Sequence, residues 1–282
     1  MTRKNFAQII EDTQFDIKRE YNRLYYLFFN FKNERSNSLR SFCEEEFQYM
    51  PFKGRCLSLA DFDNTYGFIF EENPQNVTLE NLLIFCEYTK NLIENCIWDK
   101  YRALQDYCDY DLAIDEMLDT YLNQMSEVIN VLQYSFYQKE NGKYILIPND
   151  QVLVSVVEVV DDDLSYRVIE YNHYSMKGDI NQKKTILLQL TTKLEPQRNE
   201  LKRLNKTLED NLFFLFNNLN IRHNNVTAGD NKNYKETVAK MSPDELENWY
   251  DETYQLCLLA FLELDNIERM QKIEELKKKI KN

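Results

Sequence analysis

Glycine and proline are scarce in this sequence, with five of each among 282 residues. Sheet-rich proteins need more of these residues in their turns, so the scarcity favours long helices with few connections. Apolar residues make up 43% of the chain, which is too many for a disordered protein. The length suits one large domain or two moderate ones and is enough to bury a core without metal or disulfide support.

The motifs of several common enzyme classes are also missing. The sequence contains no GxxxxGK[ST] phosphate loop, no GxGxxG dinucleotide motif, no GxSxG nucleophile elbow and no HExxH zinc motif. None of the six cysteines forms a CxxC pair or has the spacing of a zinc site. Histidine occurs only as His173 and His223. We therefore expect neither a metal nor a cofactor.

Long hydrophobic runs are absent too. The N-terminus lacks the apolar stretch of a secretory signal peptide. No run of 18 apolar residues is present, so we expect no membrane span and no membrane partner. The cysteines suggest buried apolar side chains and not a disulfide framework. These absences together predict a cytoplasmic protein.

The net charge is −13, with a pI of about 4.8. An acidic chain repels the phosphate backbone on average, so it is atypical of a dedicated nucleic-acid binder, although a local basic pocket remains compatible with it. The acidic surface also allows a decoy that binds basic partners, which is the least favoured of three functional hypotheses.

Apolar residues at helical spacing predict helices through most of the chain. The expected helices cover residues 5–32, 42–49, 78–96, 112–134, 152–160, 163–174, 179–194, 196–223 and 243–279. Thr78 is the expected N-cap of one, and Ser242-Pro-Asp-Glu245 is a capping box that opens the last. Residues 152–160 also suit a strand, but their neighbours favour a helix.

One β-hairpin is predicted near residues 134–148. Asn141-Gly142 lies between two short runs rich in aromatic and β-branched residues, which is the strongest local signal for a hairpin. A lone hairpin is marginal in water, so it must pack on helices. The expected fold is mainly α, a helical bundle with this small hairpin. It is divided into an N-terminal helical domain, 1–140, of unpredicted role and a second helical domain, 141–282.

A polar stretch follows one apolar stripe near the C-terminus. Leu208, Leu212, Leu215 and Leu219 recur at spacings of 4, 3 and 4, and the next position of the stripe is Arg222. If the helix continues, this guanidinium lies on the core side, cannot lose its proton and needs an anion. That anion is either a phosphate of a ligand or a carboxylate of the last helix. The candidate carboxylates are Glu247, Asp251 and Glu252.

Polar residues surround Arg222. Asn218, Asn224 and Asn225 are the expected substrate-binding residues, because their amides suit an RNA phosphate and its neighbouring 2′-hydroxyl. His223 lies about 100° further round a helix and joins the site only if the helix frays. The structural alternative is that the same side chains form an internal network.

Three further features have weaker functional readings. Asp111, Asp115 and Asp119 share a helical face and suit a divalent cation, but a solvated face is the favoured reading. The lysines at 272, 277–279 and 281 suit an acidic partner, but favourable interaction with the helix dipole is preferred. The 17 Phe and 19 Tyr suit base stacking, but core filling is preferred.

The arrangement over about residues 160–280 resembles the HEPN superfamily of helical bundles. It consists of a helix ending in Arg222 and polar residues, a loop, and a long capped helix. The stretch from Ile169 to Pro196 also resembles a recurrent module of bacterial proteins of this kind. Active members carry Arg, a polar residue, a short spacer and His. Arg222 matches the arginine, His223 stands at the polar position, and residues 227–229 hold no histidine.

The resemblance implies a bacterial anti-phage defence protein of the abortive-infection or toxin type. Active HEPN members are metal-independent RNases that work as dimers, so one hypothesis is an endoribonuclease that binds RNA and forms a homodimer. In it, Arg222 binds phosphate and His223 acts as acid or base. The alternative is a non-catalytic sensor or assembly protein of a defence system that binds another protein.

Overall fold

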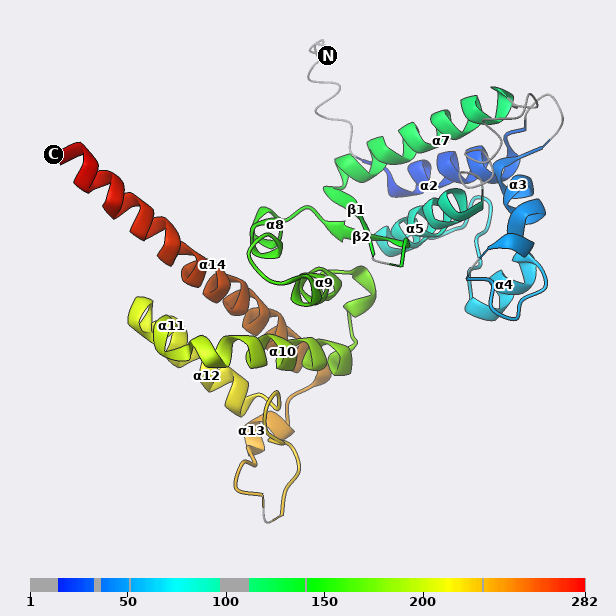
Figure 1. Ribbon diagram of the computed structural model, residues 1–282. Coiled ribbons are helices and arrows are strands. Elements are labelled where there is room, and N and C mark those ends of the chain that lie inside the picture. Colours follow the sequence, from blue (N-terminus) through cyan, green and yellow to red (C-terminus); the bar gives the residue numbers. More distant parts are fainter. Residues whose placement is uncertain are drawn as a thin grey trace, which may run out of the picture. The chain divides into compact units, whose positions relative to one another are not determined.

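The structure is a computed structural model that describes residues 15–32, 37–50, 52–96, 112–139, 141–229 and 231–281. The chain forms two compact units, Met1–Leu146 and Ile147–Asn282, and each is described by itself (Figure 1). The fold is mainly α-helical with one two-stranded antiparallel hairpin, which confirms the predicted class. Among the described residues, no helix is both long and apolar enough to cross a membrane.

The first unit is built around three helices that lie side by side, α2 (Ile17–Tyr25), α5 (Leu79–Cys96) and α7 (Leu112–Val131) (Figure 1). A π-helical turn, η1 (Tyr26–Asn30), extends α2. The shorter elements are α3 (Leu39–Glu46), the 3-10 turn η2 (Phe47–Tyr49) and α4 (Leu59–Tyr66). Of the helix predicted over 5–32, residues 5–14 lie outside the described residues.

Aromatic side chains fill the core of this unit. Phe28 is fully buried and packs against Phe85 and Tyr121, with ring centroids 6.3 Å and 5.6 Å away. The Tyr121 hydroxyl donates to Thr89 Oγ1 at 2.6 Å, so the buried phenol has a polar partner. These aromatic residues belong to the core, as their helical spacing predicts.

The hairpin consists of β1 (Tyr134–Gln138) and β2 (Tyr144–Pro148). Gly142 in the predicted turn has a φ of +77°, a conformation that glycine adopts without strain. The Asn91 side chain of α5 accepts from Tyr144 N and donates to Tyr144 O, both at 2.8 Å. The hairpin is thus held on a helix, as its marginal stability requires. The boundary between the units falls within β2, after Leu146, whereas the sequence placed it after residue 140.

Apart from the end of β2, the regular structure of the described residues of the second unit is helical. Its elements are α8 (Gln151–Val157), α9 (Asp162–Tyr171), η3 (Tyr174–Met176), α10 (Ile180–Leu194), η4 (Glu195–Gln197), α11 (Arg198–Leu204), α12 (Lys206–Asn218), α13 (Glu236–Ala239) and α14 (Pro243–Lys281). Helix α14 packs against α8, α10, α11 and α12 (Figure 1). The helix favoured for residues 152–160 is present as α8. The capping box also forms, because Ser242 Oγ accepts from Glu245 N and Glu245 Oε2 accepts from Ser242 N.

Polar side chains explain where the structure departs from the predicted helix bounds. The helix predicted over 196–223 is interrupted at Asn205, whose side chain accepts from Leu208 N and so caps α12. The helix expected to start at 163 starts one residue earlier, because Asp161 accepts from Leu164 N and caps α9. Short polar side chains compete for backbone N–H groups and end helices that the apolar periodicity alone extends. The predicted loop over 224–240 also contains the short α13.

Candidate functional site

The segment after α12 is a turn and not a continued helix. Helix α12 ends at Asn218, and Asn220 has a φ of +58° in the left-handed region. Arg222 N then donates to Phe216 O at 3.0 Å, a bond that folds the chain back on the helix end. The prediction that Arg222 continues the leucine stripe is therefore wrong, since that prediction required an unbroken helix.

Asn225 is the centre of this turn. Its side chain is fully buried, and its Nδ2 donates to the carbonyls of Asn217 at 3.2 Å and Asn233 at 2.7 Å. Its Oδ1 accepts from Asn220 N at 2.7 Å, and the Asn220 side chain accepts from Asn225 N in return. Both amide donors are therefore used within the protein. The structure assigns Asn225 to holding the loop, and its amide N–H groups do not face a ligand.

The other two predicted substrate-binding residues make local bonds. Asn224 Oδ1 accepts from the backbone N–H groups of Val226 and Thr227, which is an Asx turn. Asn218 Nδ2 donates to Phe214 O, one helical turn earlier. Both residues are near the surface. Their side chains shape the loop, and the structure does not gather them with Asn225 around one open cavity.

Arg222 pairs with a carboxylate of the protein, and this carboxylate belongs to η4 and not to the last helix. Its NH2 group lies 2.7 Å from Glu195 Oε1 of the turn η4. The predicted pairing of Arg222 with Glu247 or Asp251 of the last helix is wrong, because both of these carboxylates bind Lys183. Glu195 lies 27 positions before Arg222 in the sequence, so only the tertiary fold brings the two side chains together.

His223, the second predicted catalytic residue, is exposed. Acid–base chemistry on RNA needs a positioned group near the reacting atoms. Here the neighbouring guanidinium is paired with a carboxylate, and the nearby amides are engaged in the turn. The arrangement can bind an anion if Glu195 is displaced, but it holds no second acid or base beside His223 among the predicted residues.

A buried lysine forms a more developed charged site in the same unit. Lys183 of α10 is 5% exposed, and its Nζ lies 2.7 Å from Glu247 Oε1 and 2.6 Å from Asp251 Oδ1 of α14. The Tyr171 hydroxyl donates to Asp251 Oδ1 at 2.9 Å, and Gly178 N donates to Glu247 Oε1 at 2.8 Å. The lysine thus joins α10 to α14 through its contacts with two carboxylates, each of which accepts a further hydrogen bond.

The sequence carried a signal for this lysine. Lys183, Leu187, Leu190 and Leu194 follow the spacing 4, 3 and 4, which is the spacing that drew attention to Arg222. All three leucines are fully buried, so the cation lies on the core side of α10. A leucine stripe at this spacing therefore indicates a buried cation on α10, which continues through its stripe, but not at Arg222, which lies beyond the end of α12.

The electrostatics of the lysine site stabilise its charged state. Burial tends to raise the pKa of Glu247, but hydrogen bonds from Lys183 and Gly178 N outweigh it and lower the pKa below 4.5. Burial, with the nearby Asp251 charge, raises the pKa of Tyr171 far above its usual range, so the phenol stays protonated and donates. These shifts fit a fixed ion cluster, because every polar group has its partner.

We expect Glu247→Gln to make the free energy of unfolding less sensitive to low pH. Because folding lowers the Glu247 pKa, its stabilising contribution is fully present above pH 4.5 and is lost as pH falls through the folded-state value. The variant should be less stable at neutral pH and should lose less stability as the pH falls below 4.5. Hydrogen exchange of α10 and α14 amides against pH measures this. Glu252→Gln, an exposed residue of α14, is the matched control, and equal acid sensitivity in both variants would contradict the expectation.

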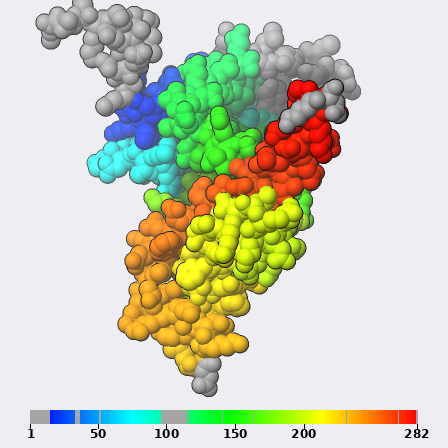
Figure 2. Space-filling view, turned by 90° about the vertical axis from the view of Figure 1, so that its left-hand side faces the viewer, coloured from blue at the N-terminus to red at the C-terminus, as the bar shows by residue number. Residues whose placement is uncertain are grey.

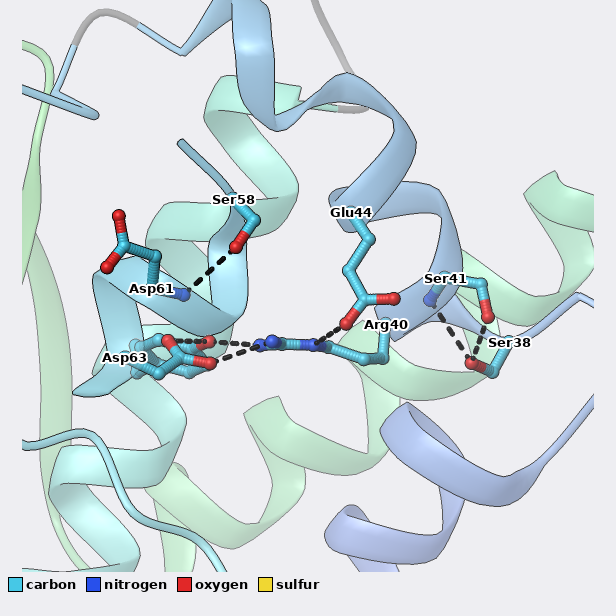
Figure 3. Close-up of polar contacts among 8 residues, drawn as sticks. Ser38, Arg40, Ser41, Glu44, Ser58, Asp61 and Asp63 are labelled. Atoms are coloured by element: carbon cyan, nitrogen blue, oxygen red, sulfur yellow. Dashed lines mark hydrogen bonds and ion pairs between the residues drawn. The ribbon is translucent and has the colours of Figure 1, made fainter. Parts of the chain in front are cut away.

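The first unit has a buried ion cluster of its own, centred on Arg40 of α3 (Figure 3). Its guanidinium lies between Asp63 Oδ2 at 2.7 Å and Glu44 Oε1 at 3.0 Å. The Tyr88 hydroxyl of α5 donates to Asp63 Oδ1 at 2.7 Å. Burial raises the pKa of Asp63, although the bonds from Tyr88 and Arg40 partly offset this. The cluster links α3, α4 and α5, so its ion pairs and hydrogen bonds stabilise the fold of the first unit.

The described residues offer no evident metal site. Among them, no three His, Cys, Asp or Glu side chains are placed to hold an ion. Of the aspartates predicted as a weak cation site, Asp111 lies outside the described residues, as does the side chain of Asp115. The described cysteines 43, 56, 86 and 257 are free thiols.

Comparison with known proteins adds no relative to this picture. No family model, no curated protein and no solved structure matches the chain.

Proposed function

We propose that this chain is a non-catalytic, HEPN-like helical protein that acts by binding another protein, as a sensor or assembly component of a bacterial defence system. The HEPN relationship and the defence setting come from the resemblance over residues 160–280. The choice of the non-catalytic reading over the RNase comes from the contacts of the Arg222 segment.

The pairing of Arg222 with Glu195 carries this choice. A phosphate-binding arginine needs its guanidinium available to the ligand, and here a carboxylate 2.7 Å away already occupies it. Asn225 is buried with both amide donors in use. Residues that resemble a catalytic motif thus serve as turn and ion-pair residues, which favours a protein that works through its surfaces.

The RNase remains the second candidate because of one observation. The Arg222 side chain is 24% exposed and that of Glu195 is 46% exposed. A phosphate could compete for this guanidinium from solvent, with the exposed His223 next to it in sequence. In that case Arg222 binds the scissile phosphate and His223 serves as acid or base.

We expect no cleavage when the purified protein is incubated with total RNA or tRNA in EDTA. Arg222→Ala should then change the stability of the second unit by less than about 1 kcal/mol, because a partly exposed ion pair contributes little. Gel analysis of the RNA and urea unfolding are the measurements. Arg203→Ala, which removes another surface pair, is the control. RNA cleavage by the unaltered protein that both Arg222→Ala and His223→Ala abolish would overturn the proposal in favour of the RNase.

A further inference from the structure

The last helix is anchored at one end and exposed at the other. Tyr250, Tyr254, Cys257 and Leu258 of α14 are buried in the second unit. From Arg269 to Ile280, by contrast, every residue is exposed. This part extends past α11 and α12 in both views (Figures 1 and 2). A preformed helix of more than three turns is therefore presented to solvent from a fixed base.

Large aliphatic side chains line one face of this exposed part. Met270, Ile273, Leu276 and Ile280 are between 46% and 75% exposed. Ile273, Leu276 and Ile280 have the 3-and-4 spacing of the a, d and a positions of a heptad. We call these four residues the α14 stripe. Isoleucine at a with leucine at d is typical of a seam between two helices.

Lysines flank the stripe on both sides. In the same heptad frame Lys272 and Lys279 take g positions and Lys277 takes an e position, where charges select the partner helix. Glu274 and Glu275 take b and c positions, outside the seam. Glu274 Oε1 lies 2.6 Å from Lys277 Nζ in an exposed pair, which holds weakly enough for a partner's carboxylate to replace it. Residues 270–281 contain five lysines and two glutamates, whereas the net charge of the whole chain is −13. The seam is thus basic where the protein as a whole is acidic.

The flanking charges argue against a second copy of this chain on the stripe. In a parallel pair of identical helices, g faces the next e of the partner, so Lys272 would meet Lys277. In an antiparallel pair e meets e and g meets g, which again brings lysines together. Like charges at these positions oppose pairing. A partner with glutamates at e and g would instead meet Lys272, Lys277 and Lys279.

The width of the stripe argues against a membrane surface. A helix lying in the lipid interface needs a broad apolar face, usually with Trp, Phe or Leu. Here the apolar face is only as wide as a heptad seam, and Lys277 lies directly beside Ile273 at its edge.

We propose that the α14 stripe binds an acidic amphipathic helix of another protein, with apolar residues at its a and d positions and glutamate or aspartate at e and g. This inference rests on the proposed protein-binding function and deepens it by naming the chemistry of the partner. Attraction between the lysines and acidic flanks selects the partner, and burial of the four aliphatic side chains stabilises the pair.

The test uses the full chain and a fluorescent three-heptad peptide with Ile at a, Leu at d and Glu at e and g. Fluorescence anisotropy should show saturable binding that weakens as salt is raised. A peptide of the same core with Lys at e and g should bind at least about tenfold more weakly. Ile273→Ser with Leu276→Ser should abolish binding, and circular dichroism should show that the exposed substitutions leave the fold intact.

Exchanging the charges tests whether binding depends on the lysines beside the seam or only on general attraction between a basic helix and an acidic peptide. Lys272→Glu, Lys277→Glu and Lys279→Glu together should invert the preference, so that the lysine peptide binds better. Lys278→Glu, at an f position away from the seam, is the matched control and should keep the original preference.

Four results would overturn the inference: no binding of the acidic peptide, binding that the serine substitutions leave unchanged, a dimer by light scattering that the serine substitutions dissolve, or binding to anionic vesicles in place of the peptide. Failure of the peptide overturns only this inference, whereas RNA cleavage in EDTA overturns only the proposed function.

Discussion

Asn225→Ala is expected to destabilise the second unit by about 3 kcal/mol or more. The substitution removes three side-chain hydrogen bonds from a fully buried position. It leaves Asn220 N–H and the carbonyls of Asn217 and Asn233 without these partners, and an unsatisfied buried group costs about 1–3 kcal/mol. Asn220 also holds a left-handed conformation, which that N–H bond helps to maintain. The turn between α12 and α13 should open.

Hydrogen exchange is the suitable measurement, because a chain of two units need not unfold in one step. Amides of residues 219–235 should lose protection first, and α12 and α14 should follow at lower urea concentration than in the unaltered protein. Asn218→Ala is the matched control. It removes an exposed side-chain bond to Phe214 O and should change stability by less than about 0.5 kcal/mol. Near-equal effects of the two substitutions would show that the turn does not depend on the buried amide.

Lys183→Met should have an effect of similar or larger size, about 3 kcal/mol. Methionine keeps the aliphatic stem of the lysine but removes the charge that pairs with Glu247 and Asp251. Two carboxylates one turn apart on α14 then lie together at the contact with α10 without a cation, and the Glu247 side chain is largely buried. Removing one member of a buried ion group leaves the other charges without compensation, which costs more than the group contributed when intact.

Two controls separate charge from packing at Lys183. Lys193→Met removes an exposed lysine of the same helix from its pair with Asp161 and should cost less than about 1 kcal/mol. Lys183→Met combined with Glu247→Gln and Asp251→Asn should recover part of the lost stability, since the uncompensated charges are gone. Urea unfolding of the second unit gives both comparisons. If the triple variant is no more stable than Lys183→Met alone, lost packing and not charge explains the effect.

Two cations of the second unit, Arg222 and Lys183, occupy similar places in the sequence but different places in the structure. Arg222 and Lys183 each stand one step from a leucine stripe, and each has an internal carboxylate partner. The lysine is buried because α10 continues through its stripe, whereas the arginine is partly exposed because α12 ends four residues before it. A stripe predicts burial only while its helix lasts.

Local signals account for the parts of the fold that could be predicted. The Asn141-Gly142 turn, the Ser242–Glu245 capping box and the Thr78 cap each depend on residues a few positions apart. The mainly α class follows from apolar periodicity and from the scarcity of glycine and proline, which sum over the whole chain. The break at Asn205 escaped prediction because its side chain binds a backbone N–H in competition with the helix. The end of α12 escaped it because Asn220 takes a left-handed conformation that the Asn225 side chain holds.

The sequence by itself therefore determined the helical class, the hairpin and the residues able to carry charge into the second unit. Only the tertiary structure decided which carboxylate each cation meets and whether Asn225 faces a ligand or the loop. Glu195 and Arg222 are 27 positions apart, and Lys183 and Asp251 are 68 apart. Such pairs form only where helices pack, and packing depends on the burial of all their apolar faces at once, which no local spacing encodes.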